Sequence, residues 1–96
     1  MIEITKKVVE RAMLVALDTK AYSKEVVEEH LAELEELANT AGAETIFKII
    51  QSKARMDSAY YIGKGKAEEL AQLIELNDIN IIIFDDDLTP VQVRNL

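Results

Sequence analysis

Two nearly unbroken runs of apolar side chains most strongly constrain the fold of this chain of 96 residues. The first run occupies residues 11–17 and stops at Asp18, and the second occupies residues 79–84 and stops at Asp85. Short apolar runs without polar alternation are typical of strands that are buried on both faces of a parallel sheet. The sequence therefore indicates an α/β fold built around these two strands.

The stretch after Ser23 has the apolar spacing of an amphipathic helix. Its stripe consists of Val27, Leu31, Leu34 and Ala38. Ser23 is a favourable N-cap residue, and Gly42 can adopt the left-handed conformation that ends many helices. These signals predict a helix between Ser23 and Gly42.

Three further elements complete the pattern. Residues 43–50 are rich in β-branched side chains but are interrupted by polar ones, which suits a strand at a sheet edge. Residues 66–76 have helical spacing, and Thr89 followed by Pro90 is a strong start signal for a third helix. The resulting β-α-β-α-β-α order predicts a three-stranded parallel sheet of order 2-1-3 with helices on both faces.

The predicted third helix has run for only two turns when the sequence reaches Leu96. We therefore expect residues 1–96 to form a single α/β domain that is a fragment of a longer protein and stops before a fourth strand. Without that strand, the outer edge of the third strand would be open, and open edges tend to pair with another chain. A homodimer is the expected consequence.

A glycine- and lysine-rich motif follows the long polar loop after the second strand. It reads Tyr61-Ile-Gly63-Lys64-Gly65-Lys66 and leads directly into the second predicted helix. Glycines allow close approach of the backbone, and free amides at a helix start attract anions together with the two ammonium groups. The motif is therefore a candidate phosphate-binding or RNA-binding site. The alternative is a flexible loop with solvated lysines.

Tyr60 and Tyr61 precede these glycines and could stack on a base or ribose, or could anchor the loop to the core. The motif matches neither a dinucleotide fingerprint nor a Walker A loop. Glu68 stands where the first needs its third glycine, and Ala67 stands where the second needs Ser or Thr.

The distribution of charge supports the same region. The chain has a net charge of −7, which argues against nucleic-acid binding by its whole surface. Between residues 48 and 66, however, Asp57 is the only acidic residue, and the basic residues there are Lys48, Lys53, Arg55, Lys64 and Lys66. We include Lys53 and Arg55 among the candidate RNA-binding residues, because a local basic loop can reach a polyanion while an acidic body stays away.

A cluster of carboxylates is the second candidate site. The predicted strand order creates a switch point between the first and third strands, where ligands bind in α/β proteins. Four residues should meet there, namely Asp18, Asp85, Asp86 and Asp87. Such a cluster could bind Mg²⁺, or it could serve helix capping and solubility.

The remaining composition gives no sign of catalysis or of a membrane span. There is no cysteine, and His30 is the only histidine, so no nucleophile–base pair can be recognised. No apolar run approaches the ~20 residues that are needed to cross a bilayer. A cytoplasmic location is the default expectation.

Several motifs resemble the amino-terminal domain of the HflX-type GTPases. They are Tyr61-Ile-Gly-Lys-Gly-Lys-Ala-Glu-Glu-Leu70, Ile83-Phe-Asp-Asp-Asp87, Leu88-Thr-Pro90, Gln92 and Arg94-Asn-Leu96. The resemblance covers nearly the whole chain. It implies a parent GTPase that is cytoplasmic and binds the large (50S) ribosomal subunit, with Mg²⁺ and GTP held by a separate GTPase domain downstream.

For this chain, the resemblance implies a regulatory module that binds ribosomal RNA or nucleotide and has no GTP-binding motif or cofactor of its own. Family members also use ATP through this region, which makes ATP a second ligand to consider at the motif of Gly63, Lys64, Gly65 and Lys66. Two alternatives remain. The domain could hydrolyse ATP itself, or it could be purely structural.

Overall fold

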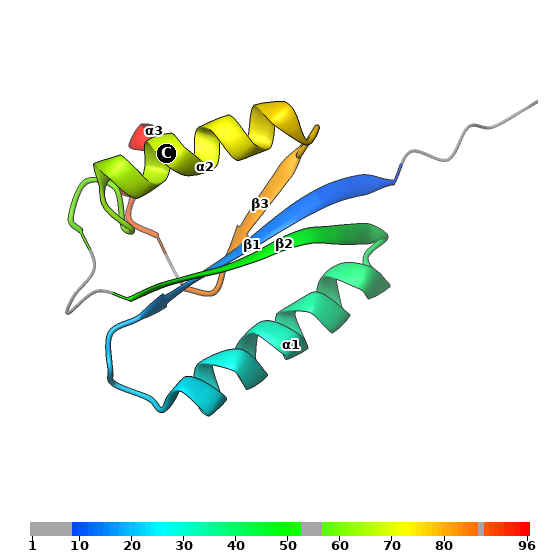
Figure 1. Cartoon of the computed structure of the whole chain (residues 1–96), viewed down its shortest axis with the longest axis horizontal. Helices are drawn as coiled ribbons and strands as arrows, with labels where there is room; N and C mark the ends of the chain where they lie inside the picture. The colour runs from blue at the N-terminus through cyan, green and yellow to red at the C-terminus, as the bar shows by residue number, and fades with distance from the viewer. Residues whose placement is uncertain (1–8, 53–56, 87) are drawn as a thin grey trace, which may run out of the picture.

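The structure is a computed structural model that describes residues 9–52, 57–86 and 88–96 (Figure 1). Its elements are β1 (Glu10–Asp18), α1 (Lys24–Thr40), β2 (Ala43–Ser52), α2 (Lys64–Leu76), β3 (Ile81–Phe84) and α3 (Pro90–Asn95). The three strands form one parallel sheet of order β2-β1-β3. The predicted fold class, strand order and helices are therefore confirmed.

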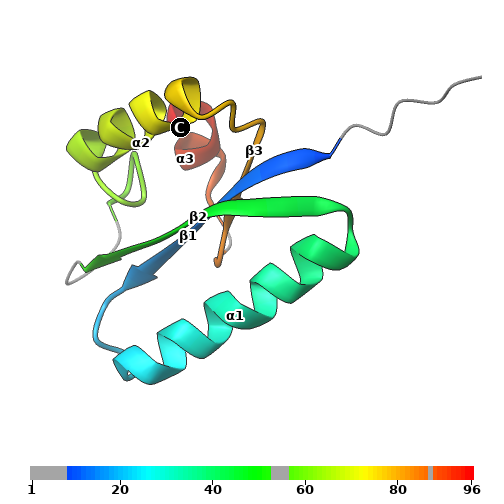
Figure 2. The ribbon, with the colours of Figure 1, turned by 45° about the vertical axis from the view of Figure 1, so that its right-hand side comes forward.

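The helices cover both faces of the sheet, as the sequence predicted. Figure 1 shows α1 on one side of the strands and α2 with α3 on the other, and the turned view in Figure 2 shows the same layers. Among the described residues, no helix is both long and apolar enough to cross a membrane.

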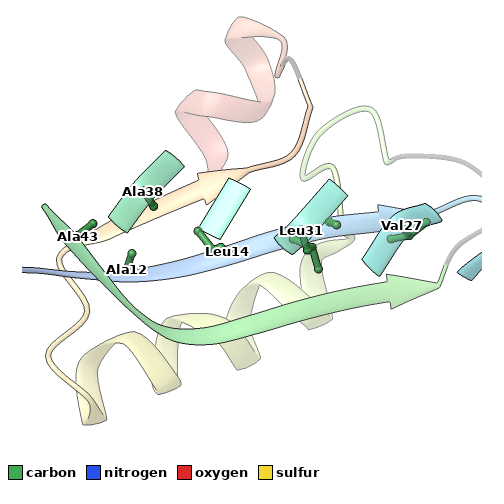
Figure 3. Close-up of a cluster of buried hydrophobic side chains, with 7 residues drawn as sticks. Ala12, Leu14, Val27, Leu31, Ala38 and Ala43 are labelled. Atoms are coloured by element: carbon green, nitrogen blue, oxygen red, sulfur yellow. The ribbon is translucent and has the colours of Figure 1, made fainter. Parts of the chain in front are cut away.

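The core on the α1 side contains the even-numbered residues of β1. Ala12, Leu14 and Ala16 pack against α1, and Figure 3 shows Ala12 and Leu14 on β1 beside the helix stripe. The buried stripe consists of Val27, Leu31 and Ala38, with Leu34 partly buried beside them. This is the spacing that the sequence predicted, since residues three and four apart share one face of a helix.

The core on the other side contains the odd-numbered residues of β1. Met13 and Val15 pack with Tyr61, Ile62 and Leu70 in a second buried cluster. Because successive side chains of a strand point to opposite faces, β1 is buried on both sides. This explains why its sequence has no polar alternation.

β2 lies at one edge of the sheet, where its polar interruptions predicted it. An irregularity in its pairing with β1 falls between Ala12 and Met13, so that Ile46 is passed over between the partners Thr45 and Phe47. The strand runs on to Ser52, two residues beyond the prediction.

β3 differs from its prediction in length and burial. It begins at Ile81, and the amide of Ile79 instead donates to the carbonyl of Ile74 at 3.1 Å, in the turn that follows α2. Asp78, with φ 52°, reverses the chain there. The strand forms the second edge of the described sheet and is mostly half-buried, whereas its apolar run predicted burial on both faces.

Candidate anion-binding site at the start of α2

The glycine–lysine motif forms the beginning of α2. The helix starts at Lys64, so the prediction that it starts at Lys66 is wrong by two residues. Gly63 is the N-cap residue, and its carbonyl accepts the amide of Ala67 at 3.0 Å. Lys64, Gly65 and Lys66 therefore make up the first turn of the helix.

The two glycines have different roles. Gly63 has φ 92° and ψ 150°, a conformation that residues with a Cβ rarely adopt. Gly65 does not have positive φ, and a Cβ built on it would meet no atom within 4 Å. The fold therefore requires glycine at position 63 but leaves open space above position 65.

The amides of this first turn are open. No side chain caps the N-terminus of α2, and the structure gives the amides of Lys64, Gly65 and Lys66 no partner among its described residues. The other two helices are capped, since the hydroxyls of Ser23 and Thr89 accept backbone amides at 3.3 and 3.2 Å. Uncapped amides at a helix start carry a partial positive charge and bind anions.

The two lysines of the motif are placed differently. Lys64 is exposed, whereas Lys66 is half-buried and its Nζ lies 3.4 Å from the carboxylate of Glu69. An ion pair of this exposed kind contributes about 0–1 kcal/mol, so Lys66 can turn to another anion at small cost. The candidates Lys53 and Arg55 lie outside the described residues.

A tight turn at residues 57–61 precedes the motif. The carboxylate of Asp57 accepts the amides of Ala59 and Tyr60 at 2.9 and 2.7 Å. The backbones of Asp57 and Tyr61 exchange two hydrogen bonds of 2.8 and 2.9 Å across the turn. Tyr61 itself has φ 60°, which is uncommon for a residue with a large side chain.

Tyr61 anchors this turn to the core. Its side chain is 1% exposed, and its ring meets Phe84 edge to face with centroids 5.7 Å apart. Its hydroxyl donates to the Asp86 carboxylate at 3.3 Å. Burial of the ring and, to a smaller extent, the negative charge of Asp86 raise the pKa of the Tyr61 hydroxyl well above its ordinary value. Tyr61 is therefore not placed to stack on a base, whereas Tyr60 is only half-buried.

The short helix α3 reaches the same turn. The Gln92 amide Nε2 donates to the Asp57 carbonyl at 2.7 Å, and the Asn95 amide Nδ2 donates to the Ala59 carbonyl at 3.0 Å. These contacts join α3 to the turn that precedes the glycine–lysine motif. The sequence analysis assigned no role to Gln92 or Asn95. Gln92 stands three residues after Thr89, and this spacing is the sequence signal of a capping box, which the structure contains.

An apolar groove of about 300 Å³ opens beside the first turn of α2. The residues that line it include Tyr60 and Lys64, Ile82 and Phe84 of the edge strand, and Leu96. The groove and the uncapped amides are thus neighbouring features on one side of the sheet.

Two of the carboxylate candidates accept hydrogen bonds from described residues. The Asp18 carboxylate accepts the amide of Lys20 at 3.0 Å, and that of Asp86 accepts the Tyr61 hydroxyl. β3 pairs its last residue, Phe84, with Val15, three residues before β1 ends, so Asp85 is not in register with Asp18. In the described part, which excludes Asp87, no group of three potential metal ligands forms.

Comparisons of the sequence with known proteins identify the family of this chain. The model of the family described as "GTP-binding GTPase N-terminal" matches residues 28–96. The chain is 47% identical over 87 residues to GTPase HflX of Caldanaerobacter subterraneus, which covers 91% of this chain and 19% of that protein. It is 44% identical over 91 residues to GTPase HflX of Lacrimispora saccharolytica, covering 95% of this chain and 21% of that protein.

A less similar relative is also an HflX protein. GTPase HflX of Escherichia coli is 37% identical over 68 residues, which cover 71% of this chain and 16% of that protein. The chain thus spans about a fifth of the length of the curated relatives it matches. It belongs to the family of GTP-binding GTPase N-terminal domains and is the N-terminal domain of an HflX-type GTPase.

Proposed function

We propose that this chain is a phosphate-binding regulatory module of an HflX-type GTPase. In this proposal the first turn of α2 binds phosphates of ribosomal RNA in the large subunit, in the cytoplasm. GTP hydrolysis, with its Mg²⁺, takes place in other parts of the parent protein, since the chain matches only about a fifth of its relatives' length.

The observation that carries this proposal is the start of α2, where three features of the sequence lower the stability of the helix. Gly63 offers no capping side chain, Lys64 and Lys66 stand in the first turn with no acidic residue, and Gly65 occupies the second position of the helix. Glycine in place of a capping residue such as Ser or Asp costs about 0.3 kcal/mol, a glycine within a helix costs up to about 1 kcal/mol relative to alanine, and each first-turn cation costs about 0.3–1 kcal/mol.

A bound phosphate reverses the sign of each of these effects. It accepts the uncapped amides, it pairs with both ammonium groups, and it can approach the backbone closely where position 65 has no side chain. Local rules that are broken together at one place are expected where a protein binds something. In contrast, α1 has both the Ser23 cap and Glu25 in its first turn.

The test is a double substitution, Lys64→Ala/Lys66→Ala, in a full-length HflX-type protein that carries this domain. We expect weaker binding to large ribosomal subunits, with the slope of log affinity against log salt reduced by about 2, because two phosphate contacts are lost. The matched control is Lys24→Ala/Lys48→Ala, which removes the same charge from exposed positions on α1 and β2. Equal binding by both variants and the unchanged protein would refute the proposal.

A nucleotide such as ATP is the second candidate ligand, because the groove beside Lys64 offers apolar walls and Tyr60 for a base. Titration with ATP would then shift the backbone resonances of Ala71 and Ile82 in the groove together with that of Gly65, whereas RNA phosphates would shift the first turn of α2 alone. The described carboxylates give no support to an intrinsic ATP hydrolase, since they form no group of three.

A further inference from the structure

A buried glutamine connects α3 to the turn that precedes α2. Gln92 is 1% exposed, and its side-chain amide acts in two ways. Its Oε1 accepts the amide of Thr89 at 2.9 Å, which completes the capping box of α3. Its Nε2 donates to the carbonyl of Asp57 at 2.7 Å, across 35 residues of sequence. The Gln92 side chain thus caps the start of α3 and also binds the turn at residues 57–61.

Asn95 adds a second contact from the same face of α3, three residues further on. Its Nδ2 donates to the carbonyl of Ala59 at 3.0 Å. Together, Gln92 and Asn95 form what we call the polar latch, which binds two carbonyls of the 57–61 turn. The Tyr61 hydroxyl adds a third connection, because it donates to Asp86 in the segment between β3 and α3.

The turn held by this latch lies directly before α2. Only Ile62 and Gly63 separate Tyr61 from the first helical residue. The left-handed backbone of Tyr61 costs about 1–2 kcal/mol for a residue with a side chain, so surrounding contacts must hold it. The contacts to the turn include those from α3, the hydrogen bond of Tyr61 to Asp86 and the core beneath Tyr61.

We propose that Gln92 and Asn95 are positioning residues, and that α3 sets the conformation of the 57–61 turn and the first turn of α2 through the polar latch. Displacement of α3 then releases the turn and the uncapped amides together. The latch itself follows from the geometry alone, whereas its effect on anion binding rests on the proposed function.

The substitution Gln92→Glu separates the two roles of this side chain. The introduced carboxylate keeps an acceptor for the Thr89 amide, since glutamate is an ordinary third residue of a capping box. It removes the donor to the Asp57 carbonyl and faces that oxygen with negative charge. α3 is therefore retained while the latch is opened.

Backbone amides report the result in the ¹⁵N-labelled chain. At neutral pH we expect the Gly63 and Gly65 resonances to move, and hydrogen exchange at Tyr60 and Tyr61 to accelerate about tenfold or more, as for loss of a buried hydrogen bond. At acid pH the introduced carboxyl is protonated and can donate again, so the exchange rates should return toward those of the unchanged chain at the same pH. A merely structural defect would not be reversed by acid.

Two comparison variants complete the test. Gln72→Glu makes the same chemical change on an exposed position of α2 and should leave the turn unchanged. Asn95→Ala removes the hydrogen bond to Ala59, keeps both hydrogen bonds of the Gln92 side chain, and should produce a smaller shift of the same resonances. If Gln92→Glu does not fold, the exchange rates and resonances of Asn95→Ala decide whether the polar latch holds the turn. Unchanged exchange and unchanged Gly63 and Gly65 resonances in the folded variants would overturn the latch.

A separate RNA titration distinguishes this inference from the proposed function. If the latch is correct and the proposed function is wrong, Gln92→Glu changes the turn but ribosomal RNA shifts no first-turn amide in either chain. If the proposed function is correct and the latch is wrong, both chains bind ribosomal RNA equally and their turns have equal exchange rates.

Discussion

Tyr61 shows how much one side chain holds together in this domain. Its ring packs on Phe84 within the core, its hydroxyl donates to Asp86, and its backbone closes the 57–61 turn. The same residue is in the left-handed region, so its backbone conformation depends on these contacts. The glycine–lysine motif is thus presented by a tyrosine that is itself unavailable to a ligand.

The raised pKa of the Tyr61 hydroxyl gives a prediction about stability and pH. The folded chain keeps this hydroxyl protonated to higher pH than the unfolded chain, so its contribution to stability is complete below about pH 10 and is lost as the pH rises further. In urea unfolding, the stability difference between the unchanged chain and Tyr61→Phe should shrink above about pH 10, by up to ~1.4 kcal/mol per pH unit. A difference that stays constant up to about pH 11 would contradict this account of Tyr61.

Among the elements, those with ordinary signals were predictable and α2 was only partly so. Ser23, Thr89 and Pro90 are standard start signals, and α1 and α3 begin where they predicted. The start of α2 has neither a cap side chain nor an acidic first turn, so the rules placed it two residues late. The burial of β1 followed from its composition alone.

The contacts of the site lay beyond sequence reasoning for a physical reason. The Gln92 amide meets the Asp57 carbonyl, a backbone group that every residue has, so no residue pairing marks the contact. The separation of Asp18 from Asp85 depends on where β3 stops relative to β1, and the pairing register sets that point. The order of strands can be inferred from their apolar content, but the pairing of individual residues between two strands cannot.

The edge strand β3 carries the prediction about association. In the described sheet its outer edge has no neighbouring strand, and Ile82 is 38% exposed beside the apolar groove. We expect the isolated chain to dimerise through this edge, and we expect Ile82→Lys to weaken the dimer, because a charged side chain on an edge strand opposes pairing. Ile50→Lys on β2 is the control, since Ile50 is similarly exposed at the opposite edge. Light scattering that finds a monomer at millimolar concentration would count against this prediction.

At the scale of the whole molecule, the two faces of the sheet differ, because the candidate functional features lie on only one of them. The α1 side is an ordinary apolar layer between a helix and the strands (Figure 3). The 57–61 turn, the glycine–lysine motif and α3 lie on the α2 side (Figure 2), and the groove beside the first turn of α2 lies there too. The features that distinguish this chain from a generic α/β domain are therefore concentrated on one side of the sheet.

The most direct test of phosphate binding is the single substitution Gly65→Ala, measured for both stability and binding. Position 65 has open space above it, so the added methyl group should stabilise α2 by about 0.5–1 kcal/mol in urea unfolding. The same methyl group should block close approach of a phosphate and weaken binding of ribosomal RNA about tenfold, roughly the cost of one hydrogen bond to a charged group. A more stable chain with weaker RNA binding is the predicted result, and a more stable chain with unchanged RNA binding would contradict the central claim.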